Sequence, residues 1–549
     1  MQRSSIWLAF FSSLLIGFFA PQSADAAGVE LRFSPSEVFW EPVDDGVRPH
    51  LPAGTPAAIP GSPDLPVVVK TVRPPAGKRL AGVRIVSQTW EHLPTPGAIA
   101  TFLPTHLDRI NPESAQVLKQ LVTQTRGGYQ RGERLDGLVI APIQERESGW
   151  FVCTRLNLEL TFEDDEGLPA ALKPRSDSNW RGALHLDSEF DFQPQPVRKA
   201  GEIESSLFRP RQDGGAVDFV IVTPEAFVEA LQPLKDWRME SGSYTVIKTV
   251  ESIYAEYPEG VDGAEKIRLF LRDAYTGWGI SDALLAGDTS TIPARFARSN
   301  FFTGDVIPTD MYYQCLDGNW NGNGNNLYGE GSRTAFFIDD ETDLFPEIFI
   351  GRLPVNTAAE ASVVVNKILT YETAPPVDAD YPASALLLAE VLFPQNWAGE
   401  PSILFDGADL AETTAVIVDN GDFEITKLYE NYLPFTGALP ETLPAVIEQI
   451  NRGHGVIHHV GHGFHNNIAV GLGGNSLTIP IVDGLSNGNR ASFLYAINCT
   501  SSAIDFDSIG EHFLRNPTGG TFSSVGSTRF DFPGTSAAYD KLFYRLIFE

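Results

Sequence analysis

The alternation of strand-sized apolar runs with helical stretches after residue 217 constrains the fold more than any other feature of this sequence. Residues 219–222 form a β-branched run typical of a strand, and 224–239 have helical spacing. Further strands are expected at 244–250, 283–288 and 385–389, further helices at 264–275, 359–371 and 406–418, and two more strands in the apolar runs that lead to His462 and Cys499. Such alternation predicts crossover connections and a mostly parallel sheet covered by helices.

Residues 28–200 follow a different pattern. Short β-branched runs at 65–69, 83–86 and 138–140 and an alternating run at 156–162 are separated by Pro- and Gly-rich segments. These runs predict an all-β domain, either a sandwich or a barrel. The chain then becomes polar and irregular, so we expect an exposed linker or processing region at 201–215 and the α/β domain at 216–549.

The first 26 residues have the three parts of a secretory leader: Arg3, an apolar stretch at 6–20, and a small-residue site at 24–26. We expect cleavage after Ala26 and export to the cell surface or the medium. An uncleaved membrane anchor is the alternative, but the apolar stretch is shorter than the roughly 20 residues that cross a bilayer as a helix. No later segment is long and apolar enough, so we expect no stable membrane insertion after cleavage.

Composition excludes several other classes. The chain has 40 Lys and Arg against 70 Asp and Glu, a net charge of -30, which argues against a nucleic-acid partner. Three cysteines, Cys153, Cys315 and Cys499, are too few for a disulfide scaffold, and their odd number leaves one thiol unpaired. A single disulfide between Cys153 and Cys315 is compatible with this count.

His462 and Cys499 each lie in a turn-like segment just after an apolar run. Loops at the carboxyl ends of parallel strands carry the chemistry of open α/β sheets, so we expect the imidazole and the thiol to meet there. A histidine beside a cysteine lowers the pKa of the thiol and can protonate a leaving amine. The backbone N–H groups of Gly463 and Cys499 are the natural donors to an oxyanion. A buried, inert thiol beside an unrelated histidine is the alternative.

A zinc site is the rival interpretation, because five histidines crowd one segment: His454, His458, His459, His462 and His465. The spacing of four between His458 and His462 serves a metal on a helix, but four glycines at 453–463 disfavour a helix there. No Glu follows His458, as a hydrolytic zinc motif requires. We therefore expect no catalytic metal, and on a strand His458 and His459 point to opposite faces, one into a polar pocket and the other under a helix.

The ordered set of motifs resembles that of the gingipain-type cysteine peptidases, secreted bacterial endopeptidases with a caspase-like fold. The resemblance rests on the apolar strands that end in Gly-His-Gly at 461–463 and Asn-Cys at 498–499, and on the segments 284–293, 346–354 and 519–528. It covers most of 217–545. Residues 28–200, including 61–67, resemble the inhibitory propeptide of that family.

The resemblance implies roles for individual residues. It maps the catalytic histidine to His462, the nucleophile to Cys499 and the oxyanion donors to the backbone of Gly463 and Cys499. The acid that orients the histidine maps most closely to Glu390, for which a surface carboxylate at a strand end is the alternative. The substrate pocket maps to Asp406, with Asp409 nearby, and to the segment that contains Arg529 and Phe532. The alternative for Asp406 is that it caps the helix that follows it. The positive charge of Arg529 would repel a substrate residue that is also positively charged.

The segment 317–325 places oxygen-bearing side chains at alternate positions, with a Gly at the sixth. This pattern matches the first half of a calcium loop of EF-hand type, with Asp317, Asn319, Asn321 and Asn323 as ligands. The twelfth position is Tyr328 instead of the usual Glu, so Glu330, Asp339, Asp340 or Asp343 has to complete the shell. A plain Asn-Gly turn is the alternative.

These observations together predict a secreted cysteine endopeptidase made as a zymogen. A β-rich propeptide acts as its inhibitor, a caspase-like α/β domain carries the site, and proteins or peptides are the substrates. We expect processing between about Arg198 and Gly215, and a natural chain that continues past Glu549. A catalytically silent module for adhesion or surface assembly is the alternative function.

Overall fold

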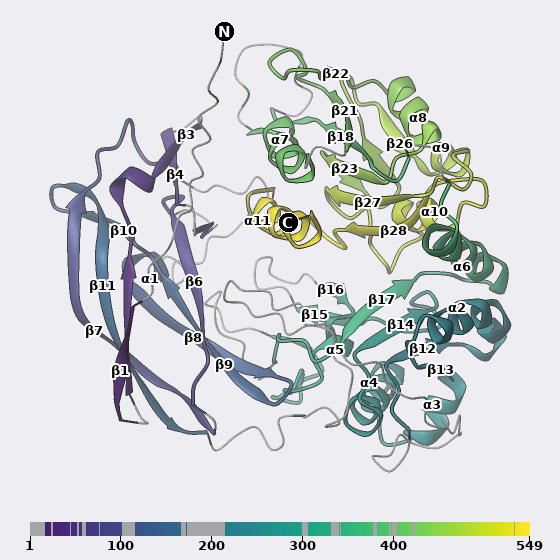
Figure 1. Ribbon diagram of the computed structural model, residues 1–549, viewed down its shortest axis with the longest axis horizontal. Helices are drawn as coiled ribbons and strands as arrows, with labels where there is room; N and C mark the ends of the chain where they lie inside the picture. Colours follow the sequence, from purple (N-terminus) through teal and green to yellow (C-terminus); the bar gives the residue numbers. More distant parts are fainter. Residues whose placement is uncertain are drawn as a thin grey trace, which may run out of the picture. The chain divides into compact units, whose positions relative to one another are not determined.

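The computed structural model (Figure 1) describes residues 17–23, 26–43, 46–51, 54–57, 62–75, 77–101, 116–165, 172, 215–298, 306–330, 340, 342–376, 381–394, 397, 403, 405–419, 423–531 and 533–548. Its contacts divide the chain into two compact units. The first contains Met1–Gly128 and Glu133–Gly167, and the second contains Tyr129–Gly132, Leu168–Ser332 and Ile338–Glu549. Residues 1–16 of the predicted leader and the whole predicted linker except Gly215 lie outside the described residues.

The first unit is built from antiparallel strands. One sheet has the order β1-β2-β11-β10 with β7 also paired to β11, a second has the order β5-β6-β9-β8, and β3 pairs with β4. The strands are β1 Gly17–Ser23, β2 Ala26–Arg32, β3 Phe39–Val43, β4 Gly46–His50, β5 Thr55–Pro56, β6 Pro66–Val72, β7 Lys78–His92, β8 Val122–Gln130, β9 Glu133–Ile140, β10 Ile143–Arg146 and β11 Gly149–Asp164. A 3-10 helix at Pro35–Glu37 and the short α-helix α1 Gln116–Lys119 lie between them.

A single apolar core holds this unit together. In β11 the side chains of Leu156, Leu158 and Leu160 are buried, in the alternation that places one face of a strand inward. They share a cluster with Val68 of β6 and Leu138 of β9, so both sheets contribute to the same core. The all-β prediction for this region is confirmed, as a sandwich of sheets.

The second unit contains two parallel sheets. The first has the order β13-β12-β14-β17, and every neighbouring pair in it is parallel. The strands and helices of this half are β12 Phe219–Thr223, α2 Val228–Glu240, β13 Thr245–Thr249, α3 Val250–Glu256, α4 Gly263–Asp273, β14 Asp282–Ala286, β15 Arg295–Arg298, β16 Val306–Thr309, α5 Met311–Gln314, β17 Phe349–Leu353 and α6 Ala358–Thr373.

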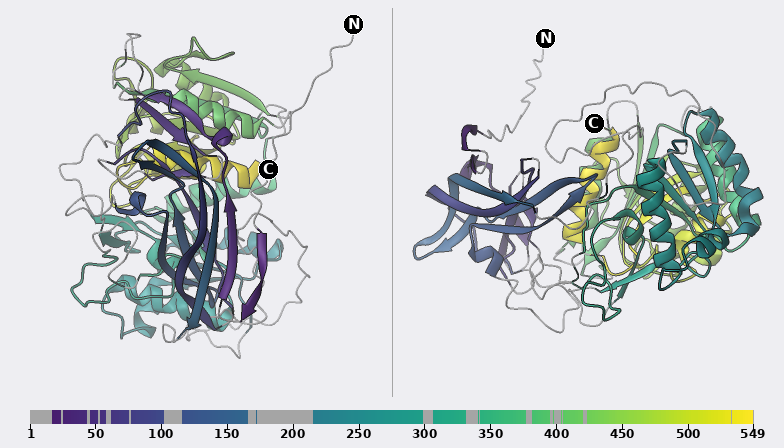
Figure 2. Two further views of the ribbon diagram at one scale, coloured as in Figure 1. Left: turned by 90° about the vertical axis from the view of Figure 1, so that its left-hand side faces the viewer. Right: turned by 90° about the horizontal axis from the view of Figure 1, so that it is seen from below.

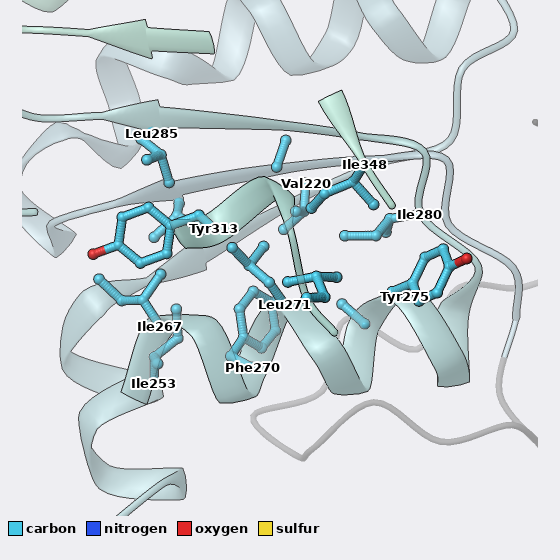
Figure 3. Close-up of a cluster of buried hydrophobic side chains, with 14 of the residues drawn as sticks. Val220, Ile253, Ile267, Phe270, Leu271, Tyr275, Ile280, Leu285, Tyr313 and Ile348 are labelled. Carbon is cyan, nitrogen blue, oxygen red and sulfur yellow. The ribbon is translucent and has the colours of Figure 1, made fainter. Parts of the chain in front are cut away.

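Helices cover both faces of this four-stranded sheet. Figure 3 shows Ile267, Phe270 and Leu271 of α4 packed toward Val220 of β12 and Leu285 of β14, and all five side chains are inaccessible to solvent. A separate cluster places α2 and α6 against the other face. The sheet is therefore buried on both sides, which explains why its strands are nearly continuous apolar runs.

The second sheet carries the predicted chemistry. Its order is β22-β21-β18-β23-β27-β28, again with every neighbouring pair parallel. The elements are β18 Ser384–Ala389, β19 Val391–Phe393, β20 Phe405–Asp406, α7 Gly407–Val418, β21 Glu424–Tyr429, β22 Leu439–Pro440, α8 Leu443–Arg452, β23 Val456–Val460, β24 Gly463–Phe464, β25 Asn467–Ala469, β26 Ser476–Thr478, α9 Ile479–Asp483, β27 Ser492–Ile497, α10 Ile509–Arg515, β28 Thr521–Gly526 and α11 Pro533–Phe548.

Helices also sandwich this six-stranded sheet. Helices α7 and α11 lie on one face and α8, α9 and α10 on the other, as Figure 1 shows and as the colours allow the reader to follow in Figure 2. Each set of helices contributes side chains to a separate apolar core. The alternation of strands and helices predicted from 217 onward is confirmed, with boundaries shifted by a few residues. Within the described residues, no helix is both long and apolar enough to cross a membrane.

Candidate active site

Two adjacent strands bring His462 and Cys499 to the same edge of the six-stranded sheet. β23 and β27 pair in parallel, with Val460 opposite Ile497. His462 and Cys499 each lie two residues beyond this last pair, and the N–H of Gly461 donates to the carbonyl of Ile497 (3.1 Å). Because the strands are buried on both faces, their register is held firmly. The thiol and the imidazole therefore leave the sheet at matching positions.

The histidine ring is held by a backbone carbonyl. Nε2 of His462 lies 3.0 Å from the carbonyl oxygen of Leu392. A carbonyl can only accept, so Nε2 carries the hydrogen and Nδ1 keeps a lone pair. The ring of Phe393 packs edge-on against the imidazole at 6.1 Å between centroids. Nδ1 is therefore the nitrogen that can take up a proton.

Glu390 takes a different position from the one expected for an orienting acid. Its Oε2 accepts the backbone N–H of His462 (2.7 Å), whereas the ring is bound by Leu392. The side chain is 6% exposed, and burial raises the pKa of Glu390 to about 8. The carboxyl group is therefore largely protonated at neutral pH, and it fixes the histidine loop instead of the imidazole. The alternative of a solvent-exposed carboxylate does not apply either.

The sequence could not reveal Leu392, because a carbonyl acts through the backbone and leaves no side-chain signal. The only indirect clue was the apolar strand before Glu390, since the acid and the carbonyl both follow β18. In the structure that segment bends into β19, which pairs with β20 and brings the carbonyl over the histidine.

The environment of Cys499 differs from the sequence-based expectation of a lowered pKa. The residue is half-buried, and burial raises the pKa of its thiol; the backbone N–H of Asp531, 3.4 Å from Sγ, works in the opposite direction. The charge of Asp531 raises the pKa further. The site thus favours a neutral thiol that loses its proton during attack.

The turn after the cysteine is strained. Thr500 has φ 56°, a left-handed conformation that is rare for a residue with a β-branched side chain. Its N–H donates to the carbonyl of Arg529 (2.9 Å), which keeps the turn in place. Such strain concentrates at sites where a side chain must be presented in one orientation.

Gly463 and Cys499, the two predicted oxyanion donors, lie side by side. A Cβ atom added to Gly463 would lie 3.1 Å from the carbonyl oxygen of Cys499 and 2.9 Å from Cγ of Asn498. Only glycine fits this position without displacing the cysteine loop. The backbone of the histidine loop therefore passes directly beside that of Cys499.

The predicted pocket residues are engaged in structural contacts. Asp406 caps α7 by accepting the N–H of Ala408 (3.0 Å), as the alternative interpretation predicted. It also accepts from the side-chain amide of Asn431 (2.8 Å). Arg529 forms a two-pronged ion pair with Asp505, at 2.9 and 2.8 Å. Its charge is thus balanced within the protein. Phe532 lies outside the described residues.

Among the described residues, no group of three His, Cys, Asp or Glu side chains is placed to hold a metal ion. His458 and His459 do point to opposite faces of β23, as predicted. The buried histidines have separate partners: His454 with Gln449 (3.2 Å), His458 with Asp540 of α11 (3.0 Å), and His459 with the carbonyl of Ala469 (2.9 Å).

The side-chain oxygens of the predicted calcium loop turn back onto its own backbone. Asn319 accepts the N–H of Asn321 (3.1 Å), and Asn323 accepts that of Asn325 (2.9 Å). Asn321 likewise accepts the N–H of Asn326 (3.0 Å). This is the arrangement of an Asn-Gly turn, and a calcium ion has to displace these bonds to use the predicted ligands.

Asp317, the one acid among those ligands, faces the interior instead. Its Oδ1 accepts the N–H of Leu172 (2.9 Å), and burial raises its pKa to about 6, with a further contribution from Asp343. Calcium binding therefore stays a proposal, and no step of the chemistry depends on it.

All three cysteines are free thiols. Cys153 and Cys315 are buried in the apolar cores of different units, so the disulfide that the cysteine count allowed is not formed. Cys499 is the most accessible of the three thiols.

Comparison with known proteins identifies relatives of this chain. A model of peptidase family C25 matches residues 212–549. Lys-gingipain of Porphyromonas gingivalis is 23% identical over 503 residues, covering 87% of this chain and 26% of the relative, so the chain spans about a quarter of that protein. Gingipain R2 of the same species is 21% identical over 300 residues, 54% of this chain and 34% of the relative. A solved complex of the pro- and mature domains of RgpB from that species is 20% identical, with a TM-score of 0.46 over 60% of this chain and 69% of that one.

Proposed function

Because the chain belongs to peptidase family C25, whose model matches more than half of it, we propose that it is a cysteine endopeptidase that hydrolyses peptide bonds through Cys499 and His462. One observation carries the proposal for these two residues. They occupy equivalent positions beyond paired strands, two residues past Val460 and Ile497. A nucleophile and its base need this kind of fixed juxtaposition.

The first half of the reaction forms an acyl-enzyme. Nδ1 of His462 takes the proton of the Cys499 thiol while the sulfur attacks the peptide carbonyl carbon. The negative charge that develops on the carbonyl oxygen is met by the N–H groups of Gly463 and Cys499. The C–N bond then breaks, and the proton on Nδ1 passes to the departing amine. Leu392 accepts the Nε2 hydrogen throughout, so the imidazolium formed midway keeps its orientation.

The second half releases the acid. Water attacks the thioester carbon, and Nδ1 of His462 takes a proton from that water. The C–S bond breaks, the proton returns to the sulfur, and the resting thiol is restored. Because burial raises the pKa of the Cys499 thiol, the reaction begins with transfer of the thiol proton to Nδ1 of His462.

We further propose that the protein is exported and made as a latent zymogen, with the β-sandwich unit as inhibitor and calcium as a structural ion. The complex of RgpB pro- and mature domains supports the pairing of such a unit with a peptidase domain. Cleavage between about Arg198 and Gly215 should release activity, and N-terminal sequencing of active material locates the cut. Full activity of the uncut precursor would contradict the inhibitor assignment.

The mechanism is tested with Cys499→Ala, and with Cys315→Ala, a buried cysteine of the same unit, as the matched control. The precursor is processed by an added protease, so that maturation does not depend on the variant. Turnover of labelled casein should vanish in Cys499→Ala and persist in Cys315→Ala, and thermal melts should show that both variants are folded. Iodoacetamide should label Cys499 in the folded protein and leave the buried Cys153 and Cys315 unlabelled. Folded protein without turnover in the wild type would favour the silent adhesion module.

A further inference from the structure

A buried chain of hydrogen bonds connects the cysteine loop to the histidine loop behind the two reactive side chains. The hydroxyl of Ser501 donates to Oδ1 of Asn498, and Nδ2 of Asn498 donates to Nδ1 of His459 (3.2 Å). Nε2 of His459 donates to the carbonyl of Ala469 (2.9 Å), and the N–H of Ala469 donates to the carbonyl of His462 (3.0 Å). Ser501, Asn498 and His459 are each at most 2% exposed.

In this series of hydrogen bonds, each group can act in only one way, either as donor or as acceptor. The carbonyl of Ala469 can only accept, so the hydrogen of His459 is on Nε2 and its Nδ1 is an acceptor. Asn498 must then present its amide NH₂ to His459, which leaves its oxygen for the hydroxyl of Ser501. Reversing any one group leaves a buried polar atom without a partner, at a cost of about 1–3 kcal/mol.

The same side chains set the spacing between the two loops. Asn498 fills the space next to Gly463, where a Cβ atom would lie 2.9 Å from Cγ of Asn498. On the other side, a Cβ atom on Gly461 would lie 2.7 Å from the ring of His459 and 2.5 Å from Oε2 of Glu390. Gly461 and Gly463 therefore lie directly against His459 and Asn498, the side chains that the hydrogen bonds hold in place.

We propose that Asn498 and His459 are positioning residues, which hold the Cys499 turn at a fixed distance from His462 and from the N–H of Gly463. The inference rests on the proposed peptidase function, and neither side chain takes part in the reaction itself. Loss of the connection should let the two loops separate, which mainly lowers kcat because the substrate pocket is left unchanged.

His459 must remain neutral for the connection to persist. Burial lowers its pKa to about 4, and the nearby His458 and His462 contribute in the same direction. Glu390, on the far side of Gly461, is the acidic group facing this ring, and its own raised pKa keeps it largely uncharged at neutral pH. The series of hydrogen bonds from Ser501 to His462 is therefore intact at neutral pH.

Asn498→Asp is the decisive variant. A carboxylate still accepts from Ser501, but it opposes the lone pair on Nδ1 of His459 at neutral pH. We expect kcat to fall about tenfold to a hundredfold, with little change in KM. The new carboxylate favours the charged form of His459 and raises the pKa of its ring, so lowering the pH places a proton between the two groups and restores their hydrogen bond. The ratio of variant to wild-type kcat should therefore rise as the pH falls from 8 to 5.

Asn487→Asp provides the matched control. Asn487 is also buried, and its amide binds the carbonyls of Arg490 and Gly520 away from the reactive pair. Its variant should show a lowered melting temperature but a ratio of kcat values independent of pH. The pair Asn498→Ala and His459→Phe should also be non-additive, with the double variant no slower than the slower single variant.

The outcomes separate the two proposals. Wild-type turnover that depends on Cys499, with a pH-independent ratio for Asn498→Asp, would overturn the positioning role and leave the peptidase function standing. A wild type without turnover would overturn both. An additive double variant would also contradict the positioning role, because it would show that the two side chains act separately.

Discussion

Two polar loops of the second unit differ in how they use their side chains. In the loop at 317–325, the oxygens of Asn319, Asn321 and Asn323 bind the backbone of the same loop. In the loops after β23 and β27, the backbone is held by neighbouring strands and by buried side chains, and His462 and Cys499 follow the two strands at matching positions. A polar residue is available for chemistry only when other groups satisfy the backbone around it.

The largest effect expected from this comparison is that of His462→Ala. Removing the base should lower kcat by at least about 10⁴-fold, whereas Asn321→Ala in the 317–325 loop should leave kcat within about twofold of the wild type. Both are measured on processed enzyme with the same peptide substrate. Comparable losses in the two variants would mean that the loops do not differ in the way described.

Gly463→Ala should have the next largest effect. The added methyl group meets Asn498 and the carbonyl of Cys499, so the oxyanion donor must shift, and we expect a loss of about 10²–10³ in kcat. Gly484→Ala is the control, since an added Cβ there has no neighbour closer than 3.4 Å and φ is -88°. Equal activity of the two variants would remove Gly463 from the oxyanion site.

Glu390→Gln should change how stability depends on pH. The pKa of Glu390 is about 8 in the folded protein, above its ordinary value of 4.5, so this group favours folding at low pH and loses that contribution as pH rises from about 4.5 to 8. The glutamine variant should therefore melt higher than the wild type by a growing margin, roughly a few degrees at pH 8.

Glu448→Gln, at an exposed position on α8, is the control for this effect and should track the wild type at every pH. The measurement is a series of thermal melts from pH 5 to pH 9. A margin for Glu390→Gln that stays constant across that range would show that the carboxyl is not protonated by its surroundings.

The smallest expected effect is that of calcium. If calcium opens the turns of the 317–325 loop and binds there, millimolar calcium should raise the melting temperature by roughly 2–4 °C after chelation, and magnesium should not. Asp317→Asn should abolish the rise. A melting temperature indifferent to calcium would show that the Asn-Gly turns are the final state of this loop.

Much of the architecture follows from local sequence patterns. The apolar run before His462 and the one before Cys499 predicted buried strands that end side by side, and Gly463 was predicted as a backbone donor to an oxyanion. The spacing of apolar residues and the length of a strand are local properties of the sequence. For this reason 219–222 and 385–389 were correctly predicted to be strands. The placement of these two strand ends at one edge of the sheet was expected because loops at the carboxyl ends of parallel strands carry the chemistry of open α/β sheets.

Other features depend on contacts between distant segments. The sequence by itself determined at which strand ends His462 and Cys499 lie and which side chains are candidates for the chemistry, because apolar periodicity and residue chemistry are encoded locally. Only the tertiary structure decided which group holds the His462 ring, what Glu390 and Asp406 bind, and whether the thiol of Cys499 is ionised. Those properties depend on burial and on backbone atoms such as the carbonyl of Leu392, which every residue has and no sequence pattern distinguishes.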